Sequence, residues 1–211
     1  MAKTITPGNH VLKINIIELE DFKFIDGAKH IIVHVETAPI EGFEGFFIDK
    51  DDESKGHYAG QIGRVKCSQY AYADGTTKTG IKIERDRSIL IFLQNLCNTL
   101  GINDWFIAQN GLHDTVEDFV KVFNASAPFQ EKFLEFCIAG KEYESKSGYT
   151  NYDLWLAKAE NRKYAYGKIE GGSVMVYDEA KHLKKLEVKD VKSFGDDEGF
   201  DMSASTDFSL D

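Results

Sequence analysis

Cysteine is scarce in this sequence, and the few cysteines form no recognisable pattern. Cys67, Cys97 and Cys137 are the only three, they lie far apart, and no CxxC pair occurs. An odd number of widely spaced cysteines indicates neither a disulfide framework nor a zinc ribbon, and free thiols are typical of a reducing compartment. We therefore expect a cytoplasmic protein.

Long apolar segments are absent as well. Residues 1–10 contain no apolar stretch of the kind that forms a signal peptide, and nowhere do about 18 apolar residues follow one another. Hydrophobic residues nevertheless make up 42% of the chain and aromatic residues 12%, which is enough for the core of a globular domain. Secretion and membrane insertion are not expected.

Motifs for catalysis, metal binding and nucleotide binding are also missing. The six histidines form no HExxH motif, and His30 and His34 fall in a predicted strand rather than on a helix. The motifs GxGxxG, GxxxxGKS/T and GxSxG do not occur. Glu84 and Asp86, near Lys82, are the only faint candidates for a carboxylate metal site. We therefore expect a protein that is not an enzyme and needs no metal or cofactor.

Negative charge dominates the chain, but it is unevenly distributed. The formal net charge is −10, from 25 basic and 35 acidic residues. Six of the acids lie in residues 195–211, which contain no Lys or Arg, so residues 1–194 hold 25 basic against 29 acidic side chains. A strongly acidic chain argues against nucleic-acid binding, which depends on Lys and Arg that displace counterions. A body that is only mildly acidic leaves room for a basic groove.

The N-terminal part of the sequence predicts strands. Residues 10–24 nearly alternate apolar and polar side chains and are rich in β-branched types, and residues 30–40 form a second such run that ends at a proline. A turn at Phe24–Gly27 joins them into a long hairpin. A shorter strand is predicted at residues 46–48, followed by a charged exposed loop at residues 49–57.

A second hairpin is predicted between residues 60 and 86. Residues 60–72 alternate apolar and polar side chains, an Ala-Asp-Gly turn follows at residues 73–75, and residues 77–86 form the returning strand. In this hairpin Tyr70 and Tyr72 lie near the tip and share one face.

The middle of the chain carries helical periodicity. Apolar residues recur at three- and four-residue spacing from Ser88, which is placed to cap the helix, to Gly101, which is placed to end it. Residues 114–123 and 128–139 show the same spacing. These segments predict a helical insertion over residues 88–139.

The remaining segments return to strands. Residues 141–157 and 163–178 are predicted strands, and residues 181–194 form a strand or a short helix. Residues 195–211 are too polar to bury themselves and are expected to be a disordered acidic tail. The order of strands, helices and strands predicts an α+β, mainly β domain over residues 1–194, whose sheet is completed by distant segments.

Aromatic and basic residues are interleaved on several predicted strands. Single-stranded nucleic acid is bound by stacking bases on aromatic rings, at about 1–3 kcal/mol per base, while cations follow the phosphates. The alternative is that the aromatic residues belong to the core and only their polar ends reach the surface. The candidate binding residues are Lys66, Tyr70, Tyr72, Lys78, Lys82, Arg85, Arg87, Lys141, Tyr143, Tyr149, Tyr152 and Trp155.

The predicted tail ends in an apolar pair set among acids. Phe208 and Leu210 stand beside Asp207 and Asp211, which suits docking into a basic pocket with an apolar floor on another protein. An acidic tail also competes with DNA for a basic groove on its own domain. The alternative is a solvated end that only aids solubility.

Three parts of the chain resemble the single-stranded DNA-binding proteins of bacteriophages and bacteria. They are ITPGNHVLKINIIELE with KHIIVHVE, then GKEYESKSGYTNYDLWLAKAENRKYAYGKI, and finally DDEGFDMSASTDFSLD. In the phage-encoded group a Pro-Gly-led strand starts an oligonucleotide/oligosaccharide-binding (OB) barrel, helices interrupt it, and a Gly-Lys strand with a Tyr-Asn pair resumes it. The resemblance implies an OB-like barrel with an acidic tail.

The same resemblance implies a function. Such a protein binds single-stranded DNA with low sequence specificity during phage DNA replication, recombination or repair, in the cytoplasm of the host cell. Its tail recruits replication or recombination proteins, and it needs no cofactor. Two other functions stay open: a protein-interaction adaptor with an acidic surface that never contacts DNA, and a metal-dependent enzyme that uses carboxylates on the sheet.

Overall fold

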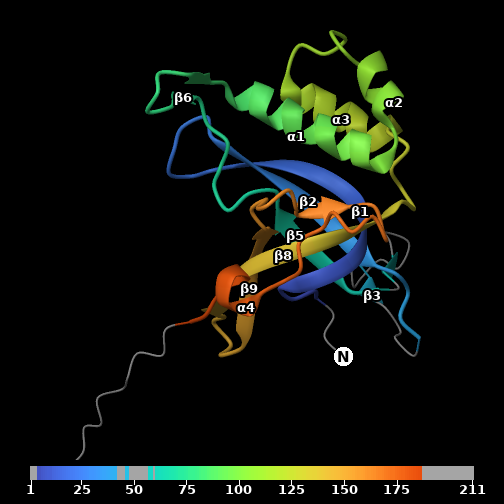
Figure 1. Cartoon of the computed structure of the whole chain (residues 1–211), viewed down its shortest axis with the longest axis vertical. Helices are drawn as coiled ribbons and strands as arrows, with labels where there is room; N and C mark the ends of the chain where they lie inside the picture. The colour runs from blue at the N-terminus through green and yellow to red at the C-terminus, as the bar shows by residue number, and fades with distance from the viewer. Residues whose placement is uncertain (1–3, 42–45, 48–56, 59, 187–211) are drawn as a thin grey trace, which may run out of the picture.

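The computed structural model describes residues 4–41, 46–47, 57–58 and 60–186. Its centre is a closed β-barrel of five strands, in which each strand pairs with the next and the last pairs back to the first (Figure 1). In their order around the barrel the strands are β1 (Gly8–Asp21), β2 (Lys29–Thr37), β5 (Ile62–Lys66), β9 (Thr150–Leu156) and β8 (Phe133–Glu144). The mainly β, α+β class predicted from the sequence is confirmed.

Barrel closure depends on the long first strand. From Leu12 to Asp21, β1 pairs with β2 on one edge, and from Gly8 to Lys13 it pairs with β8 on the other. A β-bulge between Ile14 and Ile16 inserts an extra residue and interrupts the pairing with β2. Bulges bend and twist a strand, which allows β1 to curve away from one neighbour while it keeps the other. The predicted hairpin is confirmed, and Gly27 supplies the positive φ of 69° that its turn requires.

One pair of barrel strands is parallel. Val65 of β5 pairs with Leu154 of β9 in parallel, whereas the other four pairings around the barrel are antiparallel. Parallel strands cannot be joined by a tight turn, so the chain must make a long excursion between them. The helices and β8 form that excursion.

Three helices cover one side of the barrel (Figure 1). They are α1 (Arg85–Leu100), α2 (Asn103–Ala108) and α3 (Val116–Ser126). The predicted start of the first helix is wrong, because its N-cap is Glu84 and the hydroxyl of Ser88 instead donates to the Glu84 carbonyl at 2.9 Å. The predicted end is confirmed: Gly101 adopts the left-handed conformation and its N–H bonds to the last turn.

The helix predicted for residues 128–139 is wrong. The third helix ends at Ser126, Glu131 has a positive φ of 65°, and β8 begins at Phe133. The centre of β8 is buried on both faces from Phe136 to Gly140, so it lacks the alternation that identifies a strand. The helical insertion therefore spans residues 85–126 rather than 88–139.

The second predicted hairpin is also wrong. β5 pairs with β2 and β9, while β6 (Gly75–Thr76) and β7 (Lys82–Ile83) pair only with each other. Tyr72 does not flank a hairpin tip, because its backbone forms two hydrogen bonds with Lys29 at the start of β2. Pairing with distant barrel strands, rather than the local Ala-Asp-Gly turn, therefore determines the path of residues 62–72.

The C-terminal segments add short elements to the barrel. β10 (Tyr166–Gly167) pairs with β8, so little of the strand predicted for residues 163–178 is regular. α4 (Glu179–His182) leads into β11 (Leu183–Lys184), which runs parallel to β8. A separate pair, β3 (Phe46–Phe47) and β4 (His57–Tyr58), covers part of the third predicted strand. The predicted loop at residues 49–56, the end of the predicted segment 181–194 and the predicted tail at 195–211 lie outside the described residues.

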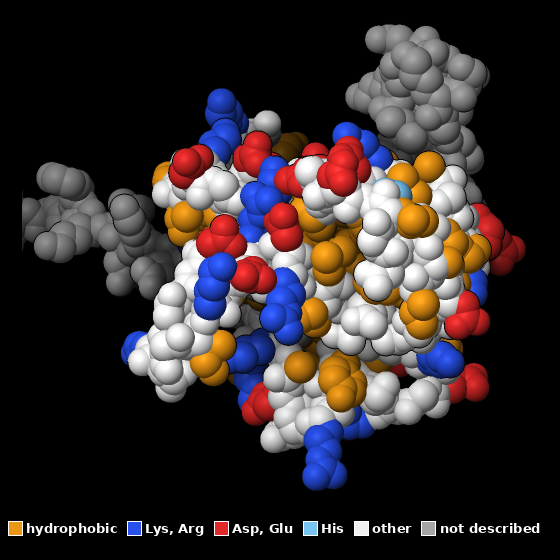
Figure 2. All heavy atoms as spheres, turned by 90° about the horizontal axis from the view of Figure 1, so that it is seen from above, with side chains coloured by type: hydrophobic (Ala, Val, Ile, Leu, Met, Phe, Trp, Pro, Cys, Tyr) orange, Lys and Arg blue, Asp and Glu red, His pale blue; other side chains and the backbone are white. Residues whose placement is uncertain are grey.

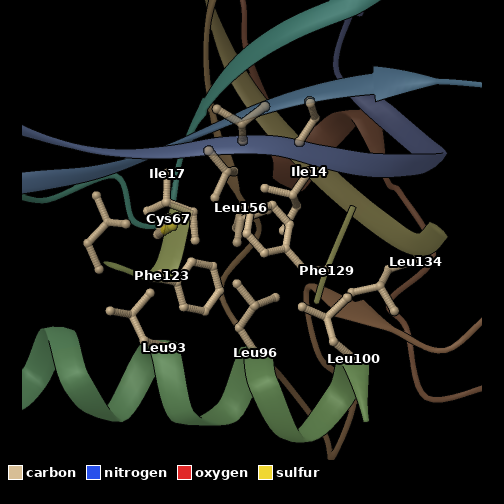
Figure 3. Packing of buried hydrophobic residues seen from close by; sticks show 14 of the residues in the cluster. Ile14, Ile17, Cys67, Leu93, Leu96, Leu100, Phe123, Phe129, Leu134 and Leu156 are labelled. Carbon is tan, nitrogen blue, oxygen red and sulfur yellow. The ribbon is translucent and has the colours of Figure 1, made fainter. Parts of the chain in front are cut away.

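The main core lies between the barrel and the helices. Leu93, Leu96 and Leu100 project from α1 towards the barrel, and Phe123 and Phe129 fill the space between them and the strands (Figure 3). The two phenyl rings stack with centroids 4.9 Å apart. Among the described residues, no helix is long and apolar enough to cross a membrane.

Asn124 of α3 joins the helices to the barrel. Its side chain accepts from the Ile17 N–H at 2.9 Å and donates to the Ile17 carbonyl at 2.7 Å. Since the pairing of β1 with β8 ends at Lys13, this amide takes the place of a strand partner. Asn124→Ala is expected to lower the free energy of unfolding by about 1–3 kcal/mol, because it leaves two backbone groups unpaired.

Urea denaturation would measure this loss. Ser126→Ala is the matched control on the same helix, because that exposed hydroxyl bonds only to the Val122 carbonyl. The control should change stability by less than about 0.5 kcal/mol. Equal effects of the two substitutions would contradict the structural role of Asn124.

Candidate nucleic-acid interface

The outer face of β5, β9 and β8 brings together residues that are distant in sequence. Trp155 lies in register with Lys66 on one side and Ala139 on the other, and Asp153 lies in register with Lys141. Side chains alternate along a strand, and Leu154 and Leu156 point into the core, so these side chains share the outer face. Three of the predicted binding residues, Lys66, Lys141 and Trp155, are therefore neighbours.

A hollow with a cavity volume of about 500 Å³ opens beside Trp155 on this face. We call it the Trp155 hollow. The indole is only 8% exposed, belongs to a small second core, and has the Lys184 Nζ 5.7 Å from its ring centroid, a cation–π distance. The predicted role of Trp155 as a ring that stacks on bases is therefore wrong, and the alternative of a core residue holds for it. The polar groups of the lining come chiefly from Gln69, Lys158, Lys181, His182 and Lys184.

The Trp155 hollow is rich in hydrogen-bond donors. Lys158 and Lys181 form no ion pair with any described residue, and Glu160 is the single acid of the described lining. The Nδ1 of His182 accepts from the Asp178 N–H at 2.9 Å, so in the neutral ring the proton is on Nε2. Lysine ammonium groups and an imidazole N–H gathered in one hollow are suited to a phosphate.

Lys66 is the next cation along the same face. Its ammonium group lies 2.8 Å from the Asp153 carboxylate, and the two side chains are 22% and 46% exposed. Such a pair is worth little in water, so a phosphate can compete with Asp153 for Lys66. Burial, followed by the nearby Lys66 charge, holds the pKa of His30 below its ordinary value, so this imidazole adds no positive charge at neutral pH.

The predicted tyrosines fall into two groups. Tyr70 and Tyr149 are each 73% exposed, and Tyr143 is exposed on β8, so these three rings are available to stack on bases. Tyr72 and Tyr152 are partly buried and pack against the core. Burial raises the pKa of Tyr72, which is typical of a structural tyrosine.

The remaining predicted cations lie elsewhere. Lys78 and Lys82 belong to the β6–β7 hairpin at the upper left of Figure 1, whereas α4 and β9, which border the Trp155 hollow, lie at the lower left. Arg85 is used structurally: its guanidinium lies 2.6 Å from Asp86 and donates to the Gly27 carbonyl at 2.7 Å. Arg87 is exposed near the start of α1.

Two groups of surface residues were not found from the sequence. Phe24 is 85% exposed at the tip of the β1–β2 hairpin. Lys181, His182 and Lys184 line the Trp155 hollow, and the signal that could have identified them is the basic run KHLKK at residues 181–185. The sequence alone does not show that this run lies beside Trp155, because that depends on the pairing of β11 with β8.

The faint carboxylate candidates form no cluster. Glu84 pairs with Lys82 at 3.0 Å, and Asp86 pairs with Arg85. Within the part of the chain that the structure describes, no three His, Cys, Asp or Glu side chains are grouped so that they could hold a metal ion. The tail candidates Asp207, Phe208, Leu210 and Asp211 lie outside the described residues.

The sequence matches no protein-family model, and no curated protein and no solved structure is similar enough to it to count as a match. The chemistry of the described surface therefore carries the functional argument.

Proposed function

We propose that this protein binds single-stranded DNA with low sequence specificity and is not an enzyme. The observation that carries the proposal is the Trp155 hollow, where lysines that pair with no described carboxylate gather on a chain whose net charge is −10. Cations that follow the phosphates and rings that stack on bases are the two components of sequence-tolerant binding to single strands. Lys66 and Lys141 extend the positive charge along the same face, and Tyr143 adds an exposed ring.

We further propose that the barrel is of the OB type. OB barrels are five-stranded Greek-key barrels that bind oligonucleotides on the face of their second and third strands, aided by the loops between strands 1 and 2 and between strands 4 and 5. Here β2 and β5 are second and third in the barrel, and the corresponding loops are residues 22–28 and 145–149. Those loops carry Phe24 and Tyr149, two of the most exposed aromatic side chains described. This correspondence supports a DNA path between the two loops.

In this proposal the protein coats exposed strands during phage DNA replication, recombination or repair in the host cytoplasm. The acidic segment with Phe208 and Leu210 recruits replication or recombination proteins, as the resemblance implies. Neither role requires a metal or cofactor.

A protein-interaction adaptor is the second candidate, and one observation favours it. Ile91 and Ile107 are exposed and line a hollow of about 420 Å³ between the helices. Figure 2, which views the helical side of the molecule, shows apolar side chains gathered on this face. An exposed apolar surface of this kind is a common protein-docking feature.

Fluorescence anisotropy of a labelled oligo(dT) titrated with the full chain tests the proposal. Binding at low salt is expected, with the logarithm of affinity falling linearly with the logarithm of salt concentration, by about 0.7 for each phosphate contacted. Mixed-sequence single strands should bind similarly, duplex DNA should bind more weakly, and the oligonucleotide should stay intact in magnesium. Failure to bind at low salt would overturn the proposal and leave the adaptor as the function to pursue.

A further inference from the structure

A second and larger hollow, of about 750 Å³, lies between the C-terminal half of α1 and residues 164–173. We call it the α1 pocket. Its apolar wall includes Phe92, Leu156 and Ala165, which join the main core. A cavity of this size, with an apolar wall and a few polar groups, has the usual form of a small-molecule site.

The rim on the helix side carries two free amides. Asn95 and Asn98 are three residues apart on α1 and therefore lie on one side of the helix. Both side chains are exposed, and neither forms a hydrogen bond with any described residue. An asparagine amide offers a donor and an acceptor together and matches the edge of a nucleobase, best that of adenine.

The charge of the α1 pocket differs from that of the chain. No acidic residue occurs in its described lining, and Lys168 is the single charged group. Lys168 forms no ion pair with the described residues. On a chain with a net charge of −10, an acid-free hollow with one unpaired ammonium group favours a ligand that carries negative charge.

The opposite rim supplies an exposed aromatic ring on a fixed backbone. Tyr164 is 57% exposed, and its N–H and carbonyl bond to Ser173 and Met175, both at 2.9 Å. A Cβ at Gly167 would come within 2.8 Å of Val174 and 2.9 Å of Ser173, so glycine is needed for these segments to approach. The wall is therefore preformed, and the Tyr164 ring is available to stack on a planar ligand.

From these features we propose that the α1 pocket binds a single nucleobase with its phosphate. The base would lie on the apolar wall against Tyr164, with its edge facing Asn95 and Asn98 and its phosphate at Lys168. A purely apolar ligand would fit less well, because it would cover both amides without pairing them. Ala159 lines both the α1 pocket and the Trp155 hollow, so a DNA strand in the hollow can deliver the base. Delivery of the base by a bound DNA strand rests on the proposed function, whereas binding of a free nucleotide is independent of it.

Calorimetric titration of the full chain with dAMP tests the proposal directly. Deoxyribose phosphate, which lacks the base, should bind much more weakly. Asn98→Ala should weaken dAMP binding by about fivefold or more, the factor expected when a two-bond contact to a base is lost. Lys168→Gln should weaken dAMP but not deoxyadenosine. Asn110→Ala and Lys121→Gln are the matched controls, exposed residues outside the α1 pocket lining, and should change nothing.

A second variant, Asn95→Trp, shows whether lost binding comes from the α1 pocket rather than from unfolding. Asn98 is exposed and alanine favours helix, so Asn98→Ala should melt like the parent. Asn95→Trp keeps an exposed helix position but places a large ring over the pocket, and should also abolish binding. Fluorescence of an adenine analogue placed inside an oligonucleotide reports whether a bound DNA strand inserts a base into the α1 pocket.

The outcomes distinguish the proposed nucleotide site in the α1 pocket from the proposed binding of single-stranded DNA. Binding of dAMP that depends on Asn98 supports the pocket with free nucleotide as its ligand, even if oligo(dT) does not bind. A change in analogue fluorescence that Asn98→Ala removes, without dAMP binding, supports the pocket as a subsite for a bound strand. If neither dAMP nor the analogue responds to Asn98→Ala and Asn95→Trp, the pocket proposal is wrong, whether or not oligo(dT) binds.

Discussion

Phe129→Ala is expected to lower the free energy of unfolding by about 3–5 kcal/mol, one of the largest effects available in this chain. Phe129 is fully buried and stacks on Phe123 with ring centroids 4.9 Å apart. It lies where the chain leaves α3 and enters the barrel, with Leu96 and Leu100 on one side and barrel residues on the other (Figure 3). Truncation removes contacts to both layers and leaves a cavity that neither layer can close alone.

Guanidinium denaturation, followed by circular dichroism, measures this change. Phe24→Ala is the matched control, because it removes the same ring at a position that is 85% exposed, and should change stability by less than about 0.5 kcal/mol. Phe129→Leu should lie between the two. A loss below about 1 kcal/mol for Phe129→Ala would mean that the helices do not pack on the barrel through this ring.

The parts of the fold that were predictable from the sequence are those that one local signal determines. The β1–β2 hairpin combines β-branched runs with a turn that contains Gly27. α1 repeats its buried residues Ile89, Leu93, Leu96 and Leu100 at helical spacing, and Gly101 caps its end. In both cases the pattern reflects a surface that is buried on one side and solvated on the other, which is the condition under which periodicity is informative.

The predictions from the sequence were wrong where a strand is buried on both faces or where it pairs with a segment distant in the sequence. Cys137 and Ala139 on the outer face of β8 are covered, in a small second core, by Val174 and Met175 from nearly forty residues further on. The apolar run of β8 therefore has no polar face, and its spacing also fits a helix. The parallel pairing of Val65 with Leu154 joins segments separated by the whole helical region, and no local feature encodes it.

The candidate interface could likewise be predicted only in part, because residue type is a local property and position in the barrel is not. Residue type alone selected lysines, arginines and aromatic residues, but barrel closure decides which of them meet. Lys66, Lys141 and Trp155 become neighbours, but Trp155 is covered in the small second core and Tyr72 packs against the main core. Arg85 fastens the start of α1 to the β1–β2 turn. A basic residue that already satisfies a carboxylate and a carbonyl is less available to a phosphate than its type suggests.

The double substitution Lys158→Glu with Lys184→Glu is expected to weaken oligo(dT) binding by about 10–100-fold. Both side chains line the Trp155 hollow and neither pairs with a described carboxylate, so each is free to contact a phosphate. Losing two such contacts should also make the dependence of affinity on salt less steep, by about 1.4 in the logarithmic slope. Anisotropy titrations at several salt concentrations give both quantities, and a thermal melt checks the fold.

A matched double variant separates a local effect from one of total charge. Lys78→Glu with Lys82→Glu changes the net charge by the same amount, but both residues belong to the exposed β6–β7 hairpin, away from the Trp155 hollow (Figure 1). If DNA lies in the hollow, this pair should weaken binding far less than the first. Equal losses would mean that only overall charge matters and would remove the hollow as the site.

A third substitution should act in the opposite direction. Asp153→Asn removes the carboxylate that lies 2.8 Å from the Lys66 ammonium group and leaves that cation free for a phosphate. Because a partly exposed pair of this kind is worth little, the gain in affinity should be modest, about twofold to fivefold. Unchanged affinity after Asp153→Asn would place the bound strand away from Lys66. Opposite signs for the lysine and aspartate variants therefore test the position of the DNA on this face as well as its sensitivity to charge.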